Sequence, residues 1–158
     1  MSSRREARES ALQGLYALEV TSADPEFIIH SVLHTERLQA DKESLNFATS
    51  LFIRTVELSG EADEIVSRYT RNWDLSRIAM IDRIILRMGI AELLTFEDVP
   101  PKVTINEMIE VAKGFSTARS GQFVNGILDS VLADLNREGR LKKRGRGLIG
   151  MEPAGKDK

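Results

Sequence analysis

Apolar residues recur every three or four positions along most of this chain, the spacing that places them on one face of an α-helix. The pattern predicts helices over about residues 3–20, 25–38, 42–58, 62–72, 75–94, 101–112 and 124–135. Alternation with a period of two never lasts long enough to predict a β-strand. We therefore expect an all-α fold of about seven helices.

Polar residues and glycines mark the ends of these predicted helices. Ser2 or Ser3 can cap the first helix, Asp24 the second and Asp41 the third. Gly60 interrupts the third apolar run, so we expect that helix to end before it. The long helix that Asp74 or Ser76 begins is the most apolar of all, and we expect it to be central and buried.

A polar stretch joins the last two predicted helices. Small and polar residues from Lys113 to Ser116 end the first of them, and the next apolar run starts at Val124. Residues 116–122, with the sequence STARSGQ, are therefore predicted to form an exposed loop. Such a loop is a plausible place to bind another molecule.

Charge is divided unevenly along the chain. The 158 residues carry a formal net charge of −2. Residues 137–158 are rich in basic residues and glycine, with no apolar periodicity, so we expect a basic, disordered tail after a helical domain of residues 1–136. Because the basic residues lie at the two ends of the chain, the body alone is not expected to bind RNA strongly.

Composition excludes several classes of protein. Cysteine is absent, which excludes disulfides and thiol chemistry. No apolar run is long enough to cross a membrane, and the N-terminus lacks the apolar core of a signal peptide, so we expect a cytoplasmic protein. His30 and His34 are one turn apart, but no third histidine or cysteine completes a metal site. Phosphate-binding glycine loops and nucleophile motifs are also missing, so we expect no metal, no cofactor and no catalysis.

Three segments resemble the NusB family of RNA-binding transcription antitermination factors. They are RREARESALQGLYALE (4–19), VPPKVTINEMIEVAKGF (99–115) and QFVNGILD (122–129). The resemblance extends from about Arg4 to Asn136. It implies a NusB-like fold of two packed helical subdomains, split near Gly60. It also implies binding of boxA RNA together with the ribosomal protein NusE, in an antitermination complex on RNA polymerase at ribosomal RNA operons.

The resemblance implies that the arginine-rich start of the first helix binds RNA. Arg4 and Arg8 lie one helical turn apart and, with Arg5, can present guanidinium groups to phosphates. We expect Arg4 and Arg8 to lie outside the apolar face. The residues alone also fit a solvated helix start, with Glu6 interrupting the basic cluster.

The segment around the predicted loop carries further candidate RNA contacts, and the resemblance favours one at Phe123. Arg119 and Gln122 can reach phosphates or base edges, and Phe123 can stack on an unpaired base. The alternatives are solvation for Arg119 and Gln122, and for Phe123 a place at the rim of the core.

Tyr16, Asp82 and Glu92 are candidates for binding the protein partner, since acidic side chains suit a basic ribosomal protein. The resemblance implies this contact for Tyr16 and Asp82. Core packing, or a salt bridge to Arg83 or Arg87, remains an alternative for these residues.

Two other functions of the protein stay open at this point. One is a helical adaptor or homodimer without an RNA role; the other is an RNA-recognition domain related to that of ribosomal RNA cytosine methyltransferases.

Overall fold

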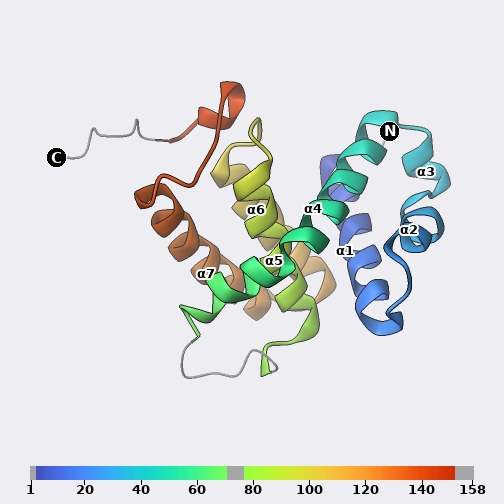
Figure 1. Ribbon diagram of the computed structural model, residues 1–158, viewed down its shortest axis with the longest axis horizontal. Helices are drawn as coiled ribbons and strands as arrows, with labels where there is room; N and C mark the ends of the chain where they lie inside the picture. Colours follow the sequence, from blue (N-terminus) through green and yellow to red (C-terminus); the bar gives the residue numbers. More distant parts are fainter. Residues whose placement is uncertain (1–2, 71–76, 152–158) are drawn as a thin grey trace.

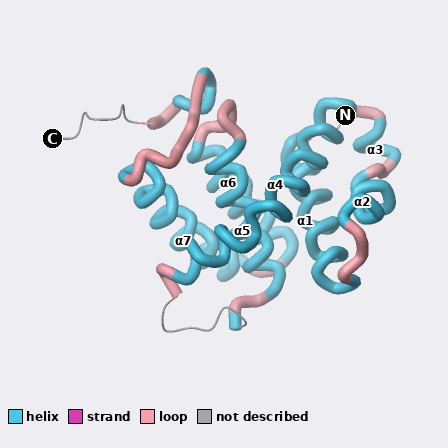
Figure 2. The backbone as a smooth tube through the Cα atoms, viewed as in Figure 1, coloured by secondary structure: helices cyan, strands magenta, loops and turns pink. Residues whose placement is uncertain are grey.

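The computed structural model describes residues 3–70 and 77–151. Over these residues the chain is helical, with no β-strand (Figure 1, Figure 2). The elements are α1 (Arg4–Thr21), α2 (Pro25–Ile28), the π-helical turn η1 (Ile29–Leu33), α3 (Glu36–Gln39), α4 (Lys42–Ser67), α5 (Met80–Thr95), α6 (Pro101–Phe115), α7 (Ala118–Arg137) and the 3-10 turn η3 (Gly145–Leu148). The predicted all-α fold is confirmed; the expected start of the central helix at Asp74 or Ser76 lies outside the described residues.

The first helix begins where the sequence predicts. The side chain of Ser3 accepts a hydrogen bond from the backbone N–H of Glu6, and the Glu6 side chain accepts one from the N–H of Ser3. This reciprocal capping box satisfies two donors that would otherwise lack partners at the helix start. The helix ends at Ser22, which adopts a left-handed conformation with φ of 55°.

The second predicted helix is divided in the structure. α2 begins as expected after Asp24, whose side chain accepts a hydrogen bond from the N–H of Glu26. The helix then widens into the π-helical turn η1 and ends at His34, which leaves the helical conformation at ψ of 58°. Thr35 caps the separate short helix α3. The single apolar stripe therefore belongs to three short pieces of helix.

The expected break at Gly60 is wrong, because α4 continues through it to Ser67. Gly60 is exposed, and no atom lies within 4 Å of the place where its Cβ would be. An exposed helical glycine costs only about 1 kcal/mol relative to alanine. Burial of Phe52 before it and Ile65 after it outweighs that cost, since both side chains are buried in the core.

The described helices form two halves joined by α4 (Figure 1). On one side, α1 packs against α2, η1 and α4. On the other side, α5 packs against both α6 and α7. As predicted, α5 is central and buried, and its buried residues include Ile84, Ile85, Leu86, Met88, Ile90, Ala91 and Leu93. The two-part arrangement is present, but no break in the chain at Gly60 separates the halves.

The predicted loop 116–122 is largely helical. Only Ser116 and Thr117 connect α6 to α7, because the side chain of Thr117 accepts a hydrogen bond from the N–H of Ser120 and starts the helix. Gly121, within α7, lies against α6: a Cβ there would be 2.9 Å from the Cγ of Lys113. The polar side chains of this stretch therefore project from a fixed helical turn.

Substitution of two glycines by alanine is expected to change the free energy of unfolding in opposite directions. Gly126 lies on the exposed side of α7, with no atom within 4 Å of the place where its Cβ would be, so Gly126→Ala should stabilise the fold by about 1 kcal/mol. In α5, a Cβ on Gly89 would lie 2.8 Å from Leu128 Cδ1, so Gly89→Ala should destabilise it by about 1–3 kcal/mol. Urea unfolding followed by circular dichroism measures both changes, and equal effects would contradict this packing.

Candidate nucleic-acid interface

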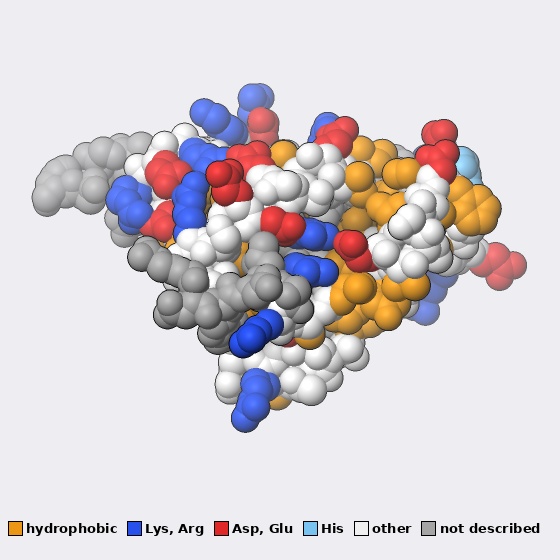
Figure 3. All heavy atoms as spheres, turned by 60° about the horizontal axis from the view of Figure 1, so that its bottom comes forward, with side chains coloured by type: hydrophobic (Ala, Val, Ile, Leu, Met, Phe, Trp, Pro, Cys, Tyr) orange, Lys and Arg blue, Asp and Glu red, His pale blue; other side chains and the backbone are white. Residues whose placement is uncertain are grey.

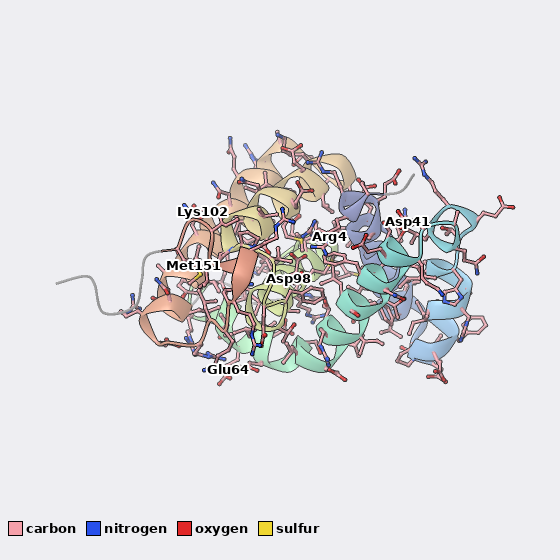
Figure 4. All side chains as sticks on the ribbon, turned by 90° about the horizontal axis from the view of Figure 1, so that it is seen from above. Arg4, Asp41, Glu64, Asp98, Lys102 and Met151 are labelled. Carbon is pink, nitrogen blue, oxygen red and sulfur yellow. The ribbon has the colours of Figure 1, made fainter. Side chains whose placement is uncertain are left out.

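A groove with a volume of about 880 Å³ lies at the N-terminal end of α1. Its walls come from α1, the start of α4, the connection between α5 and α6, the first part of α6, and the C-terminal segment. We name it the arginine groove, and it is lined by Ser3, Arg4, Arg5, Arg8, Asp41, Glu43, Ser44, Asp98, Val99, Pro100, Val103, Glu107, Arg146 and Ile149. In the view from above, Arg4 lies between Asp41 and Asp98 (Figure 4).

Arg4 and Arg5 line the groove, but carboxylates lie close to both. Arg5 donates from Nε and Nη2 to the two carboxylate oxygens of Glu107, at 2.8 and 3.0 Å. This pair raises the pKa of Arg5 and lowers the pKa of Glu107, chiefly through the hydrogen bonds. The guanidinium of Arg4 lies 3.8 Å from Asp98 and 4.5 Å from the centre of the Phe47 ring. An incoming phosphate would have to compete with these carboxylates.

The expectation that Arg8 lies outside the apolar face is wrong. Its side chain is only 2% exposed and donates two hydrogen bonds, at 2.7 and 2.8 Å, to Glu92, which is fully buried. Thr104 donates a further bond to Glu92 Oε1 at 2.7 Å. Buried charges require such partners, which is why the pair forms between α1 and α5. Neither Arg8 nor Glu92 is therefore positioned for the surface contacts expected of it.

The start of α7 carries the other three candidate RNA-binding residues. Arg119 and Gln122 are exposed, whereas Phe123 is half-buried and packs against the core. α6 connects this end of α7 to the arginines of α1, since Glu107 contacts Arg5 and Lys113 lies beside Gly121. Along α6 these two contact points are separated by about 9 Å, from a rise of 1.5 Å per residue. The two candidate RNA-binding regions thus flank the same helix.

Asp82 is buried beneath the start of α7 and is not part of an acidic surface. It is 8% exposed, and its carboxylate accepts a hydrogen bond, at 3.1 Å, from the hydroxyl of Ser120. Burial raises the pKa of Asp82, and the bond from Ser120 opposes that shift. The alternative of a salt bridge to Arg87 is also not found, because Arg87 binds Asp63 and Glu19.

Asp82 should make stability depend on pH. A carboxyl group whose pKa is raised by folding favours the folded state most below its unfolded pKa of about 3.9, and this contribution is lost as pH rises through the folded pKa. We expect Asp82→Asn to be more stable than the original protein at pH 7, with the difference shrinking toward pH 4. Urea unfolding at pH 4–7 measures this, with Asp129→Asn, on the exposed side of α7, as the control. A difference independent of pH would contradict it.

Tyr16 is the one exposed residue of the three candidates for binding a protein partner. Its side chain is 43% exposed, and Val20, one turn further along α1, is 58% exposed. Figure 3 shows apolar side chains gathered on the half of the molecule that holds α1 and α2. We name the exposed apolar residues of these two helices, Tyr16, Val20 and Phe27, the α1–α2 apolar surface.

Metal binding finds no support in the described part of the chain. Across residues 3–70 and 77–151, no group of three or more histidine, cysteine, aspartate or glutamate side chains is arranged to hold a metal ion. The rings of His30 and His34 instead contact each other edge to face, with centroids 4.8 Å apart. Within the same ranges, no helix is long and apolar enough to span a membrane.

Comparison with known proteins defines the class of this chain. The sequence profile described as the NusB family matches residues 5–133. Curated relatives named transcription antitermination protein NusB include one from Salinibacter ruber, 51% identical over 96% of this chain and 94% of its own length, and one from Chloroherpeton thalassium, 40% identical over 99% of this chain and 73% of its own. The chain belongs to the NusB family.

Solved structures agree with this assignment. NusB from T. maritima aligns with a TM-score of 0.76 and 34% sequence identity, over 84% of this chain and 92% of its own. A structure described as antitermination factors NusB and NusE in complex with dsRNA aligns with a TM-score of 0.75 and 24% identity, over 83% of this chain and 96% of the matched chain. At that identity the second likeness supports the fold alone.

Proposed function

We propose that this protein is a transcription antitermination factor that binds single-stranded boxA RNA together with the ribosomal protein NusE. The observation that carries the proposal is the 51% identity, over almost the whole chain, to a protein named for antitermination. Assembly on RNA polymerase at ribosomal RNA operons is part of the same proposal. Two surfaces of the structure fit it: the arginine groove with the start of α7 for RNA, and the α1–α2 apolar surface for protein.

The charges in the arginine groove suggest that this protein needs NusE to bind RNA tightly. Arg4 and Arg5 are about half exposed, so they can reach phosphates, but each is close to a carboxylate. RNA must then exchange an existing ion pair for a new one, which reduces the net gain from each phosphate. We infer weak RNA binding by the protein alone. NusE bound nearby would supply further contacts, so the pair would bind RNA more tightly.

The test is binding of fluorescent boxA RNA, with and without NusE, against a scrambled RNA of equal length. We expect tight, sequence-dependent binding only when both proteins are present. The double variant Arg4→Ala/Arg5→Ala should weaken it by about tenfold. The logarithm of the RNA association constant falls linearly with the logarithm of the salt concentration, and the double variant should make this fall less steep by about 1.4. Each phosphate that is no longer neutralised contributes about 0.7 to the steepness.

The matched control is Arg54→Ala/Arg68→Ala, which removes two exposed, ion-paired arginines that do not line the groove. It should leave the salt slope almost unchanged. Equal effects of the two double variants would argue against the groove. Absence of RNA binding by the protein with NusE would reject the proposed function and favour an adaptor or homodimer.

A further inference from the structure

The C-terminal segment is folded onto the arginine groove, which the composition of the tail does not predict. Residues 137–151 do not form the expected disordered tail; residues 152–158 lie outside the described residues. The ammonium group of Lys143 donates to the carbonyl oxygens of Glu92 and Phe96 at 3.3 and 2.7 Å. The backbone N–H of Arg144 donates to the carbonyl of Glu97 at 3.0 Å. These bonds hold the segment against the end of α5.

This docking places Arg146 and Ile149 in the wall of the groove, together with the arginines of α1. The other groove arginines have acidic neighbours: Glu92 binds Arg8, Glu107 binds Arg5, and Asp98 lies 3.8 Å from Arg4. Arg146 differs from them, since among residues 3–70 and 77–151 no carboxylate lies within 4.0 Å of its guanidinium. It is exposed, and its charge is available to an anion.

Apolar side chains lie beside this available charge. Val103 and Ile149 line the same groove and are 42% and 61% exposed, so both side chains offer apolar surface to a bound molecule. An unpaired nucleotide combines an anionic phosphate with a flat base that packs on apolar surfaces. The groove thus offers both kinds of contact within one cavity of about 880 Å³, large enough for more than a single nucleotide.

We propose that the C-terminal segment is part of the RNA-binding site, with Arg146 binding a phosphate of the single strand and Ile149 and Val103 packing against one of its bases. This inference rests on the proposed function and adds a binding element to it. Asp98 and Glu107 repel phosphates, and Arg146 adds to the same groove a positive charge that no carboxylate of the described residues pairs with. The segment also fixes the path of the RNA relative to Arg4 and Arg5, because its hydrogen bonds hold it to α5.

The experiment compares Arg146→Ala with Arg144→Ala in the binding of boxA RNA by the protein together with NusE. Both variants remove one positive charge from the same short segment, but Arg144 binds Glu97 and does not line the groove. We expect Arg146→Ala to weaken binding by about five- to tenfold and to lower the salt slope by about 0.7. Arg144→Ala should change affinity by less than about twofold. Unchanged melting temperatures establish that both variants remain folded.

A second variant tests the base contact separately. Ile149→Ser should weaken RNA binding without changing the salt slope, because it removes apolar surface and no charge. Equal decreases in affinity for Arg144→Ala and Arg146→Ala, or no decrease for either, would overturn the inference while leaving RNA binding intact. Weaker binding of NusE by Arg146→Ala or Ile149→Ser in the absence of RNA would also overturn the inference, since the groove would then bind a segment of NusE. If the unaltered protein and NusE do not bind boxA RNA, the proposed function itself fails.

Discussion

Replacing Arg8 with alanine is expected to cost about 3–5 kcal/mol of folding free energy, a large part of the stability of a domain this size. The change leaves the carboxylate of Glu92 fully buried without the opposite charge that now binds it. Thr104 still donates one bond to Glu92, which is not enough to replace the two from Arg8. Thermal and urea unfolding of Arg8→Ala measure the decrease in stability.

Two comparisons make this prediction specific to the buried pair. Arg5→Ala removes the same kind of side chain from a half-exposed pair with Glu107, and should cost no more than about 1 kcal/mol. The double variant Arg8→Met/Glu92→Met replaces both charges with apolar side chains, and should recover most of the stability. A small effect of Arg8→Ala would contradict the burial of this pair. If the folded double variant bound RNA more weakly than the unaltered protein, Arg8 would have a direct role in RNA binding.

The second large effect is expected from Gly147→Val in η3. Gly147 is buried, and a Cβ there would overlap the carbonyl oxygen of Glu97. The obstructing atom belongs to the backbone of the connection between α5 and α6, which moves aside less easily than a flexible side chain, so the C-terminal segment should move away instead. The overlap should cost about 1–3 kcal/mol, enough to detach a segment held mainly by a few hydrogen bonds. Limited trypsin digestion measures the detachment as faster cleavage after Lys142, Lys143 and Arg144.

Leu148→Ala is the matched control for this prediction. Leu148 is the next residue in the same turn and is 53% exposed, so its truncation should leave the segment docked. Equal cleavage rates for Gly147→Val and the unaltered protein would contradict the docking. If docking places Arg146 for RNA, Gly147→Val should also decrease RNA affinity about as much as Arg146→Ala.

Local signals in the sequence predict where helices start better than where they end. Ser3, Asp24, Asp41 and Thr117 all accept a hydrogen bond from a backbone N–H at a helix start, and the sequence predicts the first three of these caps. A start depends on a side chain that reaches only two or three residues. Whether a helix ends at a glycine such as Gly60 depends on how much apolar surface the segments before and after the glycine bury. That burial is decided by residues distant in the sequence.

The burial of Arg8 has a signal in the sequence that the arginine cluster obscures. Arg8 lies four and seven residues before Leu12 and Leu15, which places it on their face of α1. Glu92 is likewise a single acidic residue among the apolar residues that end α5. Two opposite charges on two apolar helix faces are compatible with a buried pair. Because they are 84 positions apart in the sequence, only the folded structure shows that they bind each other.

The arginine groove can be predicted only in part. Arg4 and Arg5 follow from the resemblance, because the family motif covers them. Glu107 and Arg146 do not, since one lies in the middle of a helix and the other in a segment with no apolar periodicity. The C-terminal segment docks mainly through main-chain carbonyls and a buried glycine, and such contacts leave little trace in side-chain patterns.

The continuity of α4 has a consequence for how this protein can be taken apart. At 1.5 Å per residue its 26 residues span about 39 Å, and one unbroken helix packs against both α1 and α5. A chain cut at Gly60 would leave each fragment with part of a helix whose apolar face is uncovered. Exchange of halves between relatives should therefore use a junction outside α4.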